Sequence, residues 1–394
     1  MSQHQRSNEQ VRRANLRGVL HALHYDGPHS RAALTKRTGF YRSTIAALVS
    51  ELVQLDLASE ALPEERTGVG RPSPIVAINP RIVALVAYPD VGAVVVGIVG
   101  LGGVVHVRQR RELSERPSAV EVVHEIAVAV ERLRPELDAY DRVVGLGVAV
   151  PALVDVETGT VELAPNLKWT GEPLARLLEE RLDIPVVLAN DAQVGAAAER
   201  QFGPGRGVDH MIYVNGSGGG IGGGAYVDGH ELRGYRGFGA EFGHIVIDPG
   251  GEACYCGQRG CFERVVRQSE LLELIGRGSL DADELEQALV SNTDAALARA
   301  MDQQVDRLGD GIAVLVSALA PQLVVLGGFL SSLYRARPER LAARLAERSF
   351  GALSADVRVV SGGLGAHEVL VGISERVFER VFADPVVFGS ATAA

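Results

Sequence analysis

The sequence predicts an α/β protein in which a small winged helix-turn-helix head, residues 1–80, precedes a larger body, residues 81–394. Helical patterns separated by a tight glycine turn occupy the head, whereas valine-rich strand patterns alternate with helical patterns along the body. The charges divide at the same place. The head carries ten Lys or Arg and seven Asp or Glu, and the body carries 29 and 42. An apolar content of 46% in 394 residues excludes a mostly disordered chain.

The head opens with a helix whose apolar residues recur at helical spacing and which ends at an Asp-Gly-Pro turn. Ser30 is a suitable N-cap for a second helix over 31–38, and Gly39 can end that helix in a left-handed turn. A third helix begins at Arg42 or Ser43 and carries its apolar residues on one face. A short helix, a glycine turn and a further helix are typical of a helix-turn-helix.

Two short strands, Leu57–Leu62 and Ile75–Ile78, follow, and the polar loop between them is predicted to be a wing. In this interpretation the third helix enters the DNA major groove and its N-terminal residues meet base edges. Basic residues of the second helix lie near phosphates, and the wing tip reaches the minor groove. The residues predicted to contact a double-stranded DNA operator are Arg31, Lys36, Arg37, Tyr41, Arg42, Ser43, Thr44 and Arg71. The pattern alone also allows a three-helix module that binds another protein.

The body begins with a valine-rich stretch, 82–107, in which proline, aspartate and glycines interrupt the apolar run, so strands are predicted there rather than a membrane span. The further predicted strands are Val143–Val150, Val186–Ala189, Met211–Val214, Ile221–Val227, Leu323–Leu326 and Val357–Val360. The further predicted helices are Ala119–Leu133, Leu174–Leu182, Ala192–Arg200, Ser269–Leu274, Ala282–Val290, Ala295–Leu308, Gly311–Ala320 and His367–Val381. The N-terminal ten residues are polar and carry no apolar run of a secretory signal, so we expect a cytoplasmic protein without membrane association.

The most specific local pattern is a cluster of metal-ligand residue types. His244 is followed by Cys254, Cys256 and Cys261, the three cysteines of the chain. One imidazole and three thiolates form the closed set of four ligands that is typical of a structural Zn²⁺ site, because no ligand position is left for water. The alternative, free thiols beside a core histidine, is disfavoured by this spacing.

Polar residues also stand out in the apolar body, and they are Asn166, Asn190, Asp191, Glu241 and Glu263. Asn190 and Asp191 end a predicted strand, which is where α/β sheets bind ligands. Carboxylates and amides suit the hydroxyl groups of a sugar, and a carboxylate can also act as a general base. Each residue taken singly is typical of a turn or a helix cap, and spacing alone does not show that they converge.

At these residues the sequence resembles the ROK family (repressors, open reading frames and kinases). The matching segments are Gly147–Asn166, Asn190–Glu199, Gly216–Gly224, Gly239–His244 and Cys254–Glu263. The head, with its Gly70-Arg71-Pro72, resembles the winged helix of the NagC- and XylR-type transcriptional repressors of that family. The resemblance covers nearly the whole chain. It implies an actin-like, two-lobed sugar-kinase fold, with a second lobe from about residue 201 and a C-terminal helix that returns to the first lobe.

The resemblance further implies a sugar or sugar phosphate in the cleft between the lobes, held by Asn166, Asn190, Asp191, Glu241, His244 and Glu263. His244 would then serve both the Zn²⁺ ion and the sugar, and Asp191 matches the catalytic base of the family's kinases. Two departures favour a regulator. The first hairpin of the body offers Asp90-Val91-Gly92-Ala93, where the kinases hold ATP phosphate with Asp-x-Gly-Gly-Thr. The threonine of the kinases' Gly-Thr-Gly loop falls near Gly219, or near Ser217. We therefore expect sugar binding without efficient phosphoryl transfer.

Taken together, the sequence predicts a sugar-responsive transcriptional regulator, most simply a repressor of carbohydrate-metabolism genes, that is not an enzyme. A homodimer or a dimer of dimers is expected, because two recognition helices read two half-sites. The alternative is an ATP-dependent sugar kinase with an appended DNA-binding head. A scaffold that binds another protein and has lost the sugar is disfavoured by the retained polar residues.

Overall fold

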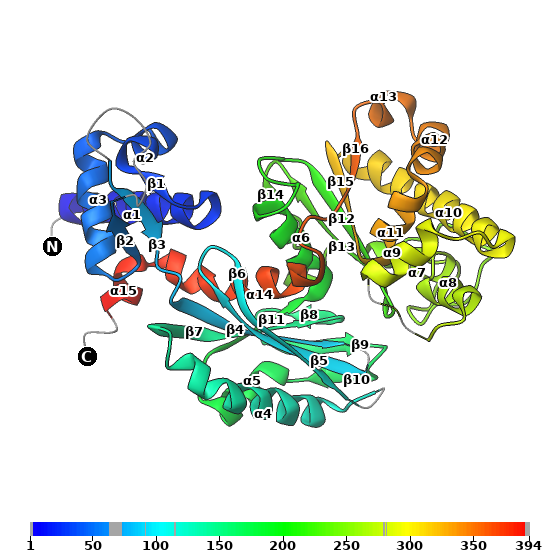
Figure 1. Ribbon diagram of the computed structural model, residues 1–394, viewed down its shortest axis with the longest axis horizontal. Coiled ribbons are helices and arrows are strands. Elements are labelled where there is room, and N and C mark those ends of the chain that lie inside the picture. Colours follow the sequence, from blue (N-terminus) through cyan, green and yellow to red (C-terminus); the bar gives the residue numbers. More distant parts are fainter. Residues whose placement is uncertain are drawn as a thin grey trace.

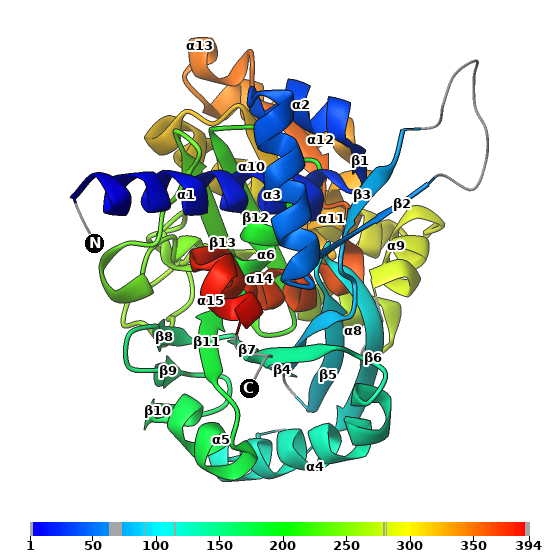
Figure 2. The ribbon, with the colours of Figure 1, turned by 90° about the vertical axis from the view of Figure 1, so that its left-hand side faces the viewer.

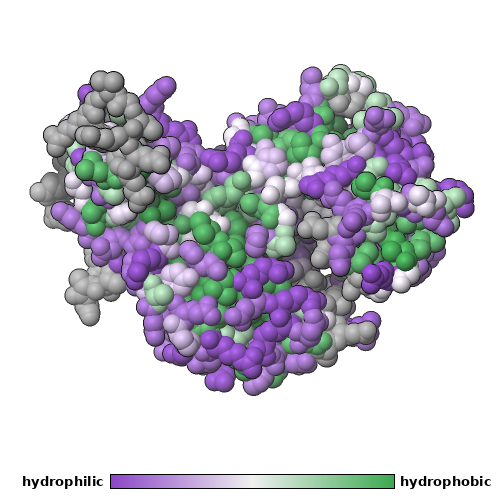
Figure 3. Space-filling model, in the orientation of Figure 1, coloured by the Kyte–Doolittle hydropathy of each residue, from purple (hydrophilic) through white to green (hydrophobic). Residues whose placement is uncertain are grey.

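The computed structural model describes residues 3–62, 73–90, 92–113, 116–278, 280 and 282–390. The described chain forms three bodies, which Figure 1 shows as a head on the left, a first lobe at the bottom and a second lobe on the right. In the space-filling view a notch separates the head from the second lobe (Figure 3). No helix of the described residues has the length and apolar character needed to cross a membrane.

The head is a winged helix-turn-helix, as predicted. Its elements are α1 (Gln3–Asp26), β1 (His29–Ser30), α2 (Arg31–Thr38), α3 (Arg42–Gln54), β2 (Ala58–Ala61) and β3 (Ile75–Ile78). The Ser30 Oγ accepts a hydrogen bond from the Ala33 backbone N–H at 3.2 Å, and Gly39 ends α2 with a φ of 74°. β2 and β3 pair antiparallel. Residues 63–72 of the loop between them, including Arg71, lie outside the described residues.

The first lobe is built on a five-stranded sheet with the strand order β11-β7-β4-β5-β6. Its strands are β4 (Ile82–Asp90), β5 (Ala93–Gly100), β6 (Val104–Glu112), β7 (Arg142–Val150) and β11 (Val186–Asn190). Helices α4 (Ala119–Leu137) and α5 (Leu174–Leu182) share a hydrophobic core with one face of the sheet. On the other face, α14 (Glu368–Ala383) packs so closely on β7 that a Cβ at Gly147 would lie 2.8 Å from an Ile373 side-chain atom. The last long helix therefore packs on the first lobe.

The second lobe repeats this topology with the strand order β14-β13-β12-β15-β16. Its strands are β12 (Met211–Ser217), β13 (Gly220–Val227), β14 (His230–Glu231), β15 (Leu323–Gly327) and β16 (Arg358–Ser361). Its helices are α7 (Phe262–Val265), α8 (Gln268–Ile275), α9 (Ala282–Val290), α10 (Ala295–Leu319), α11 (Gly328–Ala336), α12 (Pro338–Arg348) and α13 (Gly351–Ser354). In each lobe the first three strands of the sheet, in chain order, form an antiparallel meander. The other two strands of that sheet run parallel to its first strand, β4 in the first lobe and β12 in the second. Two lobes of one topology are the arrangement expected of an actin-like fold.

One prediction about the second lobe is wrong. The helices predicted over Ala295–Leu308 and Gly311–Ala320 are a single helix, α10. The two glycines at the predicted break are packing positions, since a Cβ at Gly309 would lie 2.6 Å from Arg344 and one at Gly311 would lie 2.5 Å from the Phe262 ring. The sequence also did not predict the second-lobe helices α7, α11, α12 and α13 or the terminal helix α15 (Pro385–Ser390). A small sheet of the first lobe was missed as well, formed by β8 (Leu153–Asp155), β9 (Thr160–Ala164) and β10 (Trp169–Glu172).

The head is fixed to the first lobe through buried polar contacts between α1 and α14. The Glu375 carboxylate is 2.9 Å from the His24 Nε2 and accepts a hydrogen bond from the Tyr25 hydroxyl at 2.8 Å. The Gly102 backbone N–H donates to the His24 Nδ1 at 2.9 Å. Because Nδ1 accepts this bond, the proton of a neutral His24 ring lies on Nε2 and points to Glu375. Figure 2 shows α14 and α15 directly below α1.

Candidate functional site

The central cavity lies between the two lobes and has a volume of about 320 Å³. It is lined by all six residues that the resemblance assigned to the sugar: Asn166, Asn190, Asp191, Glu241, His244 and Glu263. Three of these come from the first lobe and three from the second, so the fold brings together segments that are far apart in the sequence. A volume of this size is typical of a small-molecule site.

The first-lobe wall is built where β11 ends and α6 (Asp191–Gln201) begins. Asn190 is the N-cap of α6, with its Oδ1 accepting from the Gln193 backbone N–H at 2.9 Å. The Asp191 carboxylate accepts from the Ala192 backbone N–H at 2.8 Å and from the Tyr88 hydroxyl at 3.2 Å. The strand end thus holds a buried carboxylate in a fixed orientation at the cavity wall.

Asn166 extends from the first lobe to the glycine-rich hairpin of the second lobe. Its Nδ2 donates to the Gly219 backbone oxygen at 2.6 Å. The next residue, Gly220, has a φ of 139°, and a Cβ there would lie 2.5 Å from the Glu263 Oε2. Glycine is therefore required at this position for both the backbone conformation and the close approach of Glu263.

The second-lobe wall is acidic. Glu241 is an exposed residue at the cavity wall. Protein atoms around its carboxyl group nevertheless displace part of the surrounding water, and this desolvation raises the pKa of Glu241 to about 7. The negative charges of Asp191 and Glu263 contribute to the same shift. No lysine or arginine is among the described residues that line the cavity. Such a wall suits a neutral molecule that donates several hydrogen bonds.

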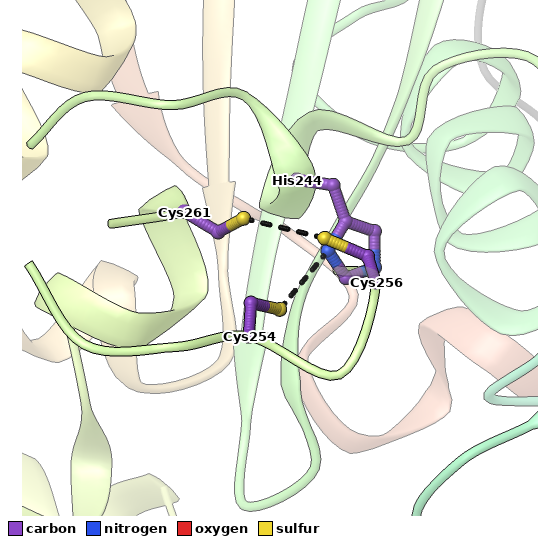
Figure 4. A group of neighbouring side chains, drawn as sticks. All are labelled: His244, Cys254, Cys256 and Cys261. Atoms are coloured by element: carbon purple, nitrogen blue, oxygen red, sulfur yellow. Dashed lines mark hydrogen bonds between the residues drawn. The ribbon is translucent and has the colours of Figure 1, made fainter. Parts of the chain in front are cut away.

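The predicted metal ligands converge beside this cavity. One ligand atom from each of His244, Cys254, Cys256 and Cys261 can be chosen so that all four lie within 4.8 Å of one another. The Cys256 and Cys261 sulfurs are 3.5 Å apart, and the Cys254 sulfur is 3.6 Å from the His244 Nδ1 (Figure 4). Tetrahedral coordination with Zn–S bonds of about 2.3 Å requires sulfurs about 3.8 Å apart, so the cluster could hold an ion of this size.

Three residues of the site were not predicted from the sequence. Tyr255 lines the cavity, and its hydroxyl is 3.0 Å from the His244 Nε2. Tyr88 contacts Asp191 from β4, and Asn215 lines the cavity from β12. The position of Tyr255 between two predicted metal ligands is a sequence signal that could have placed it near the cavity. The contacts of Tyr88 and Asn215 depend on how the strands pair, which the sequence pattern does not show.

The predicted DNA-contacting residues lie on the surface of the head, and two of them have partners within the protein. Tyr41, Arg42 and Ser43 are exposed at the N-terminus of α3, Thr44 is half-buried, and Lys36 and Arg37 are exposed on α2. Arg37 pairs with Asp26 at 2.8 Å, and Arg31 pairs with Glu60 of β2 at 2.6 Å. DNA binding by these residues stays a prediction.

A buried carboxyl group behind the cavity makes stability depend on pH. Burial raises the pKa of Glu368, at the start of α14, to about 8, against 4.5 in an unfolded chain. Between these values the folded protein keeps a proton that the unfolded chain has released, so the free energy of unfolding falls as the pH rises from 4.5 to 8. Glu368→Gln, which stays neutral, is expected to be more stable than the parent at pH 8 and to lose this advantage towards pH 5.

Urea denaturation at pH 5, 6.5 and 8 measures this difference. The exposed Glu339→Gln on α12 is the matched control, and its effect should not change with pH. A stability difference for Glu368→Gln that is equal at all three pH values would show that Glu368 is ionised in the folded protein.

Comparisons with known proteins agree with this architecture. The model of the ROK family matches residues 91–378. The xylose repressor of Bacillus subtilis strain 168 is 27% identical over 384 residues, which cover 94% of this chain and 96% of the repressor. A glucokinase of Thermotoga maritima is 31% identical over 254 residues, covering 60% of this chain and 78% of the kinase. Among solved structures, a ROK family transcriptional regulator described as a homologue of the E. coli MLC protein covers 95% of this chain at 22% identity, with a TM-score of 0.75.

Proposed function

Because this chain belongs to the ROK family, we propose that it is a sugar-responsive transcriptional repressor, in which residues 1–80 bind DNA and residues 81–394 bind the effector. The proposal rests on two features that occur in one chain: the N-terminus of α3 is exposed in the head, and carboxylates line a cavity between the two lobes. The similarity to a xylose repressor spans both parts, whereas the similarity to a glucokinase covers a smaller share of the chain.

The effector that the cavity favours is a neutral sugar. Asp191, Glu241 and Glu263 supply three carboxyl groups, and the described lining contains no basic residue other than His244. A phosphate monoester carries a charge of about −1.5 to −2 near neutral pH and would be repelled by these groups. Sugar hydroxyls can instead donate to the carboxylates and accept from the Asn166 and Asn190 amides. A pentose or hexose is therefore favoured over a sugar phosphate.

Zn²⁺ is the metal that we assign to His244, Cys254, Cys256 and Cys261. Three thiolates and one imidazole are ligands that Zn²⁺ prefers, and four protein ligands close the site to substrate. The role is structural: a bound ion would fix the loop that carries Tyr255 and Cys256 along the cavity.

The kinase alternative is disfavoured at the residues that would perform phosphoryl transfer. The predicted phosphate loops lack the kinase pattern at Gly92 and Gly219, and Val91 between Asp90 and Gly92 lies outside the described residues. Purified protein with ATP, Mg²⁺ and D-xylose or D-glucose is expected to form no ADP above background. Turnover at tens per second, within the range of sugar kinases, would replace this proposal with the kinase.

Selection from random-sequence DNA duplexes tests the regulator directly. A homodimer, or a dimer of dimers, should select an inverted repeat whose half-sites lie about 34 Å apart or a multiple of that distance, and a neutral sugar should change the affinity. Absence of any sequence preference, with and without sugar, would contradict the proposal.

Asp191→Asn is expected to weaken sugar binding about 10- to 100-fold, because the variant loses charge-assisted hydrogen bonds to the effector. Its affinity for the selected DNA without sugar should be unchanged, since Asp191 lines the cavity and none of the described residues predicted to contact DNA does. Calorimetry with the sugar and fluorescence anisotropy with the labelled duplex measure the two affinities. Asp183→Asn, an exposed position beyond α5, is the matched control. A full sugar response of Asp191→Asn would remove this carboxylate from the effector site.

A further inference from the structure

Tyr255 occupies an unusual place between the metal cluster and the cavity. It stands between the ligands Cys254 and Cys256, so its backbone belongs to the loop that the metal would fix. Its side chain is nevertheless 51% exposed and lines the cavity together with Asp191, Glu241 and Glu263. The tyrosine side chain thus faces the cavity from a backbone that a bound ion would hold on both sides.

The Tyr255 hydroxyl contacts His244 at Nε2, whereas the Cys254 sulfur lies near Nδ1. The His244 Nδ1 faces the Cys254 sulfur at 3.6 Å, which places the imidazole among the ligands. The His244 Nε2 is 3.0 Å from the Tyr255 oxygen, and the two rings meet edge to face with centroids 5.0 Å apart. A histidine that binds a metal through one nitrogen carries a proton on the other and donates it. With an ion bound through Nδ1, Tyr255 would therefore accept the one hydrogen bond that the His244 Nε2–H donates.

We propose that Tyr255 is a specificity-determining residue that occupies, in the free protein, the hydrogen bond that a sugar hydroxyl takes when the effector binds. This inference rests on the proposed function. A phenol oxygen and a sugar hydroxyl are equivalent acceptors for the Nε2–H of His244. A sugar must displace the phenol to reach His244. The free energy needed to break the Tyr255–His244 hydrogen bond therefore reduces the binding free energy of every sugar that uses His244. A sugar without a hydroxyl at this place leaves the Tyr255 bond intact and gains nothing from His244.

Tyr255→Phe tests the competition. The variant keeps the ring and removes the competing hydroxyl, so the dissociation constant for the effector sugar should fall about three- to tenfold, the size of one net hydrogen bond. Calorimetry with D-xylose and D-glucose measures it in the full-length protein, and metal analysis should still give one ion per chain. Tyr235→Phe, a fully exposed tyrosine outside the cavity lining, should bind as the parent does. An unchanged or weaker affinity of Tyr255→Phe would overturn the inference.

A second measurement uses the parent protein and covers the case in which the variant loses its metal. The ¹⁵N resonance of the His244 Nε2 should shift when the sugar is added to saturation, because its hydrogen-bond partner changes, and a resonance that stays in place would overturn the inference. If the parent protein binds no sugar at all, the proposed function fails first. If the parent binds sugar and Tyr255→Phe does not bind it more tightly, only the role of Tyr255 fails.

Discussion

Cys261→Ser is expected to empty the metal site, lower the melting temperature and weaken effector binding by at least about 100-fold. Cys261 is fully buried, and its sulfur lies 3.5 Å from that of Cys256, so an oxygen there cannot complete the set of thiolates. Structural Zn²⁺ sites contribute about 10–16 kcal/mol of apparent binding free energy that is coupled to folding of their ligands. Loss of the ion is therefore expected to unfold the whole loop that carries Cys254, Cys256 and Cys261, and not only to displace one side chain.

The effector site is affected because metal ligands and cavity residues share the same short segments. Glu263 follows Cys261 by two residues, and the Phe262 N–H between them donates to the Ile245 carbonyl oxygen at 2.9 Å, next to the ligand His244. The backbone of Gly260, the residue before Cys261, accepts from Ile247 at 3.0 Å and donates to Glu252 at 2.8 Å. Without the ion, both Glu263 and His244 lose their fixed positions at the cavity wall.

Metal analysis, a melting curve and calorimetry with the effector sugar measure the three consequences. Arg259→Ala changes an exposed side chain of the same loop and should leave all three unchanged. Prolonged dialysis of the parent protein against a chelator should reproduce the Cys261→Ser result. A metal-free protein with normal sugar affinity would show that the cluster does not support the cavity.

The parts of this molecule that the sequence predicts are those whose determinants are local. Ser30 and Gly39 cap α2 at the expected residues, because a cap depends on neighbours within four positions. The four metal ligands lie within 18 residues and carry chemistry that few other arrangements need. The glycines of α10 mislead for the opposite reason: Gly309 and Gly311 make room for Arg344 and Phe262, which come from other elements.

The set of residues that line the cavity could be predicted only from the resemblance to the ROK family. Asn166, Asn190, Glu241 and Glu263 come from four segments, and the resemblance grouped them where spacing could not. Tyr255 and Tyr88 were missed because their contacts arise from ring orientation and strand pairing. The strands β8 to β10 have three to five residues each, too short for a periodic signal, and pair only with one another.

The head packs against α14, the helix that also packs on α6 at the cavity wall. A Cβ at Gly372 of α14 would lie 1.9 Å from the Val194 backbone oxygen of α6, the helix that begins with Asp191. One turn further along α14, Glu375 binds His24 and Tyr25 of α1. Packed contacts thus connect α6 to the head through α14, and we expect a displacement of α6 to change the position of α3.

Arg42→Ala is expected to weaken binding to the selected operator about 100-fold or more without changing sugar affinity. Arg42 is exposed at the first turn of α3, next to Tyr41, whose side chain is 84% exposed. A side chain at this place in a recognition helix reaches base edges, and one good arginine contact is worth about 1–3 kcal/mol. In a dimer both half-sites lose the contact, so the two losses add in free energy.

Anisotropy titrations with the operator and with a scrambled duplex, at two salt concentrations, distinguish base reading from charge attraction. A lost base contact lowers operator affinity far more than scrambled-duplex affinity, whereas a lost phosphate contact weakens both equally and reduces the salt dependence. Arg176→Ala removes an arginine that is also exposed, on α5 of the first lobe, and should leave both affinities unchanged. Equal weakening on the two duplexes would place Arg42 at the phosphates, and an unchanged operator affinity would exclude the N-terminus of α3 from the major groove.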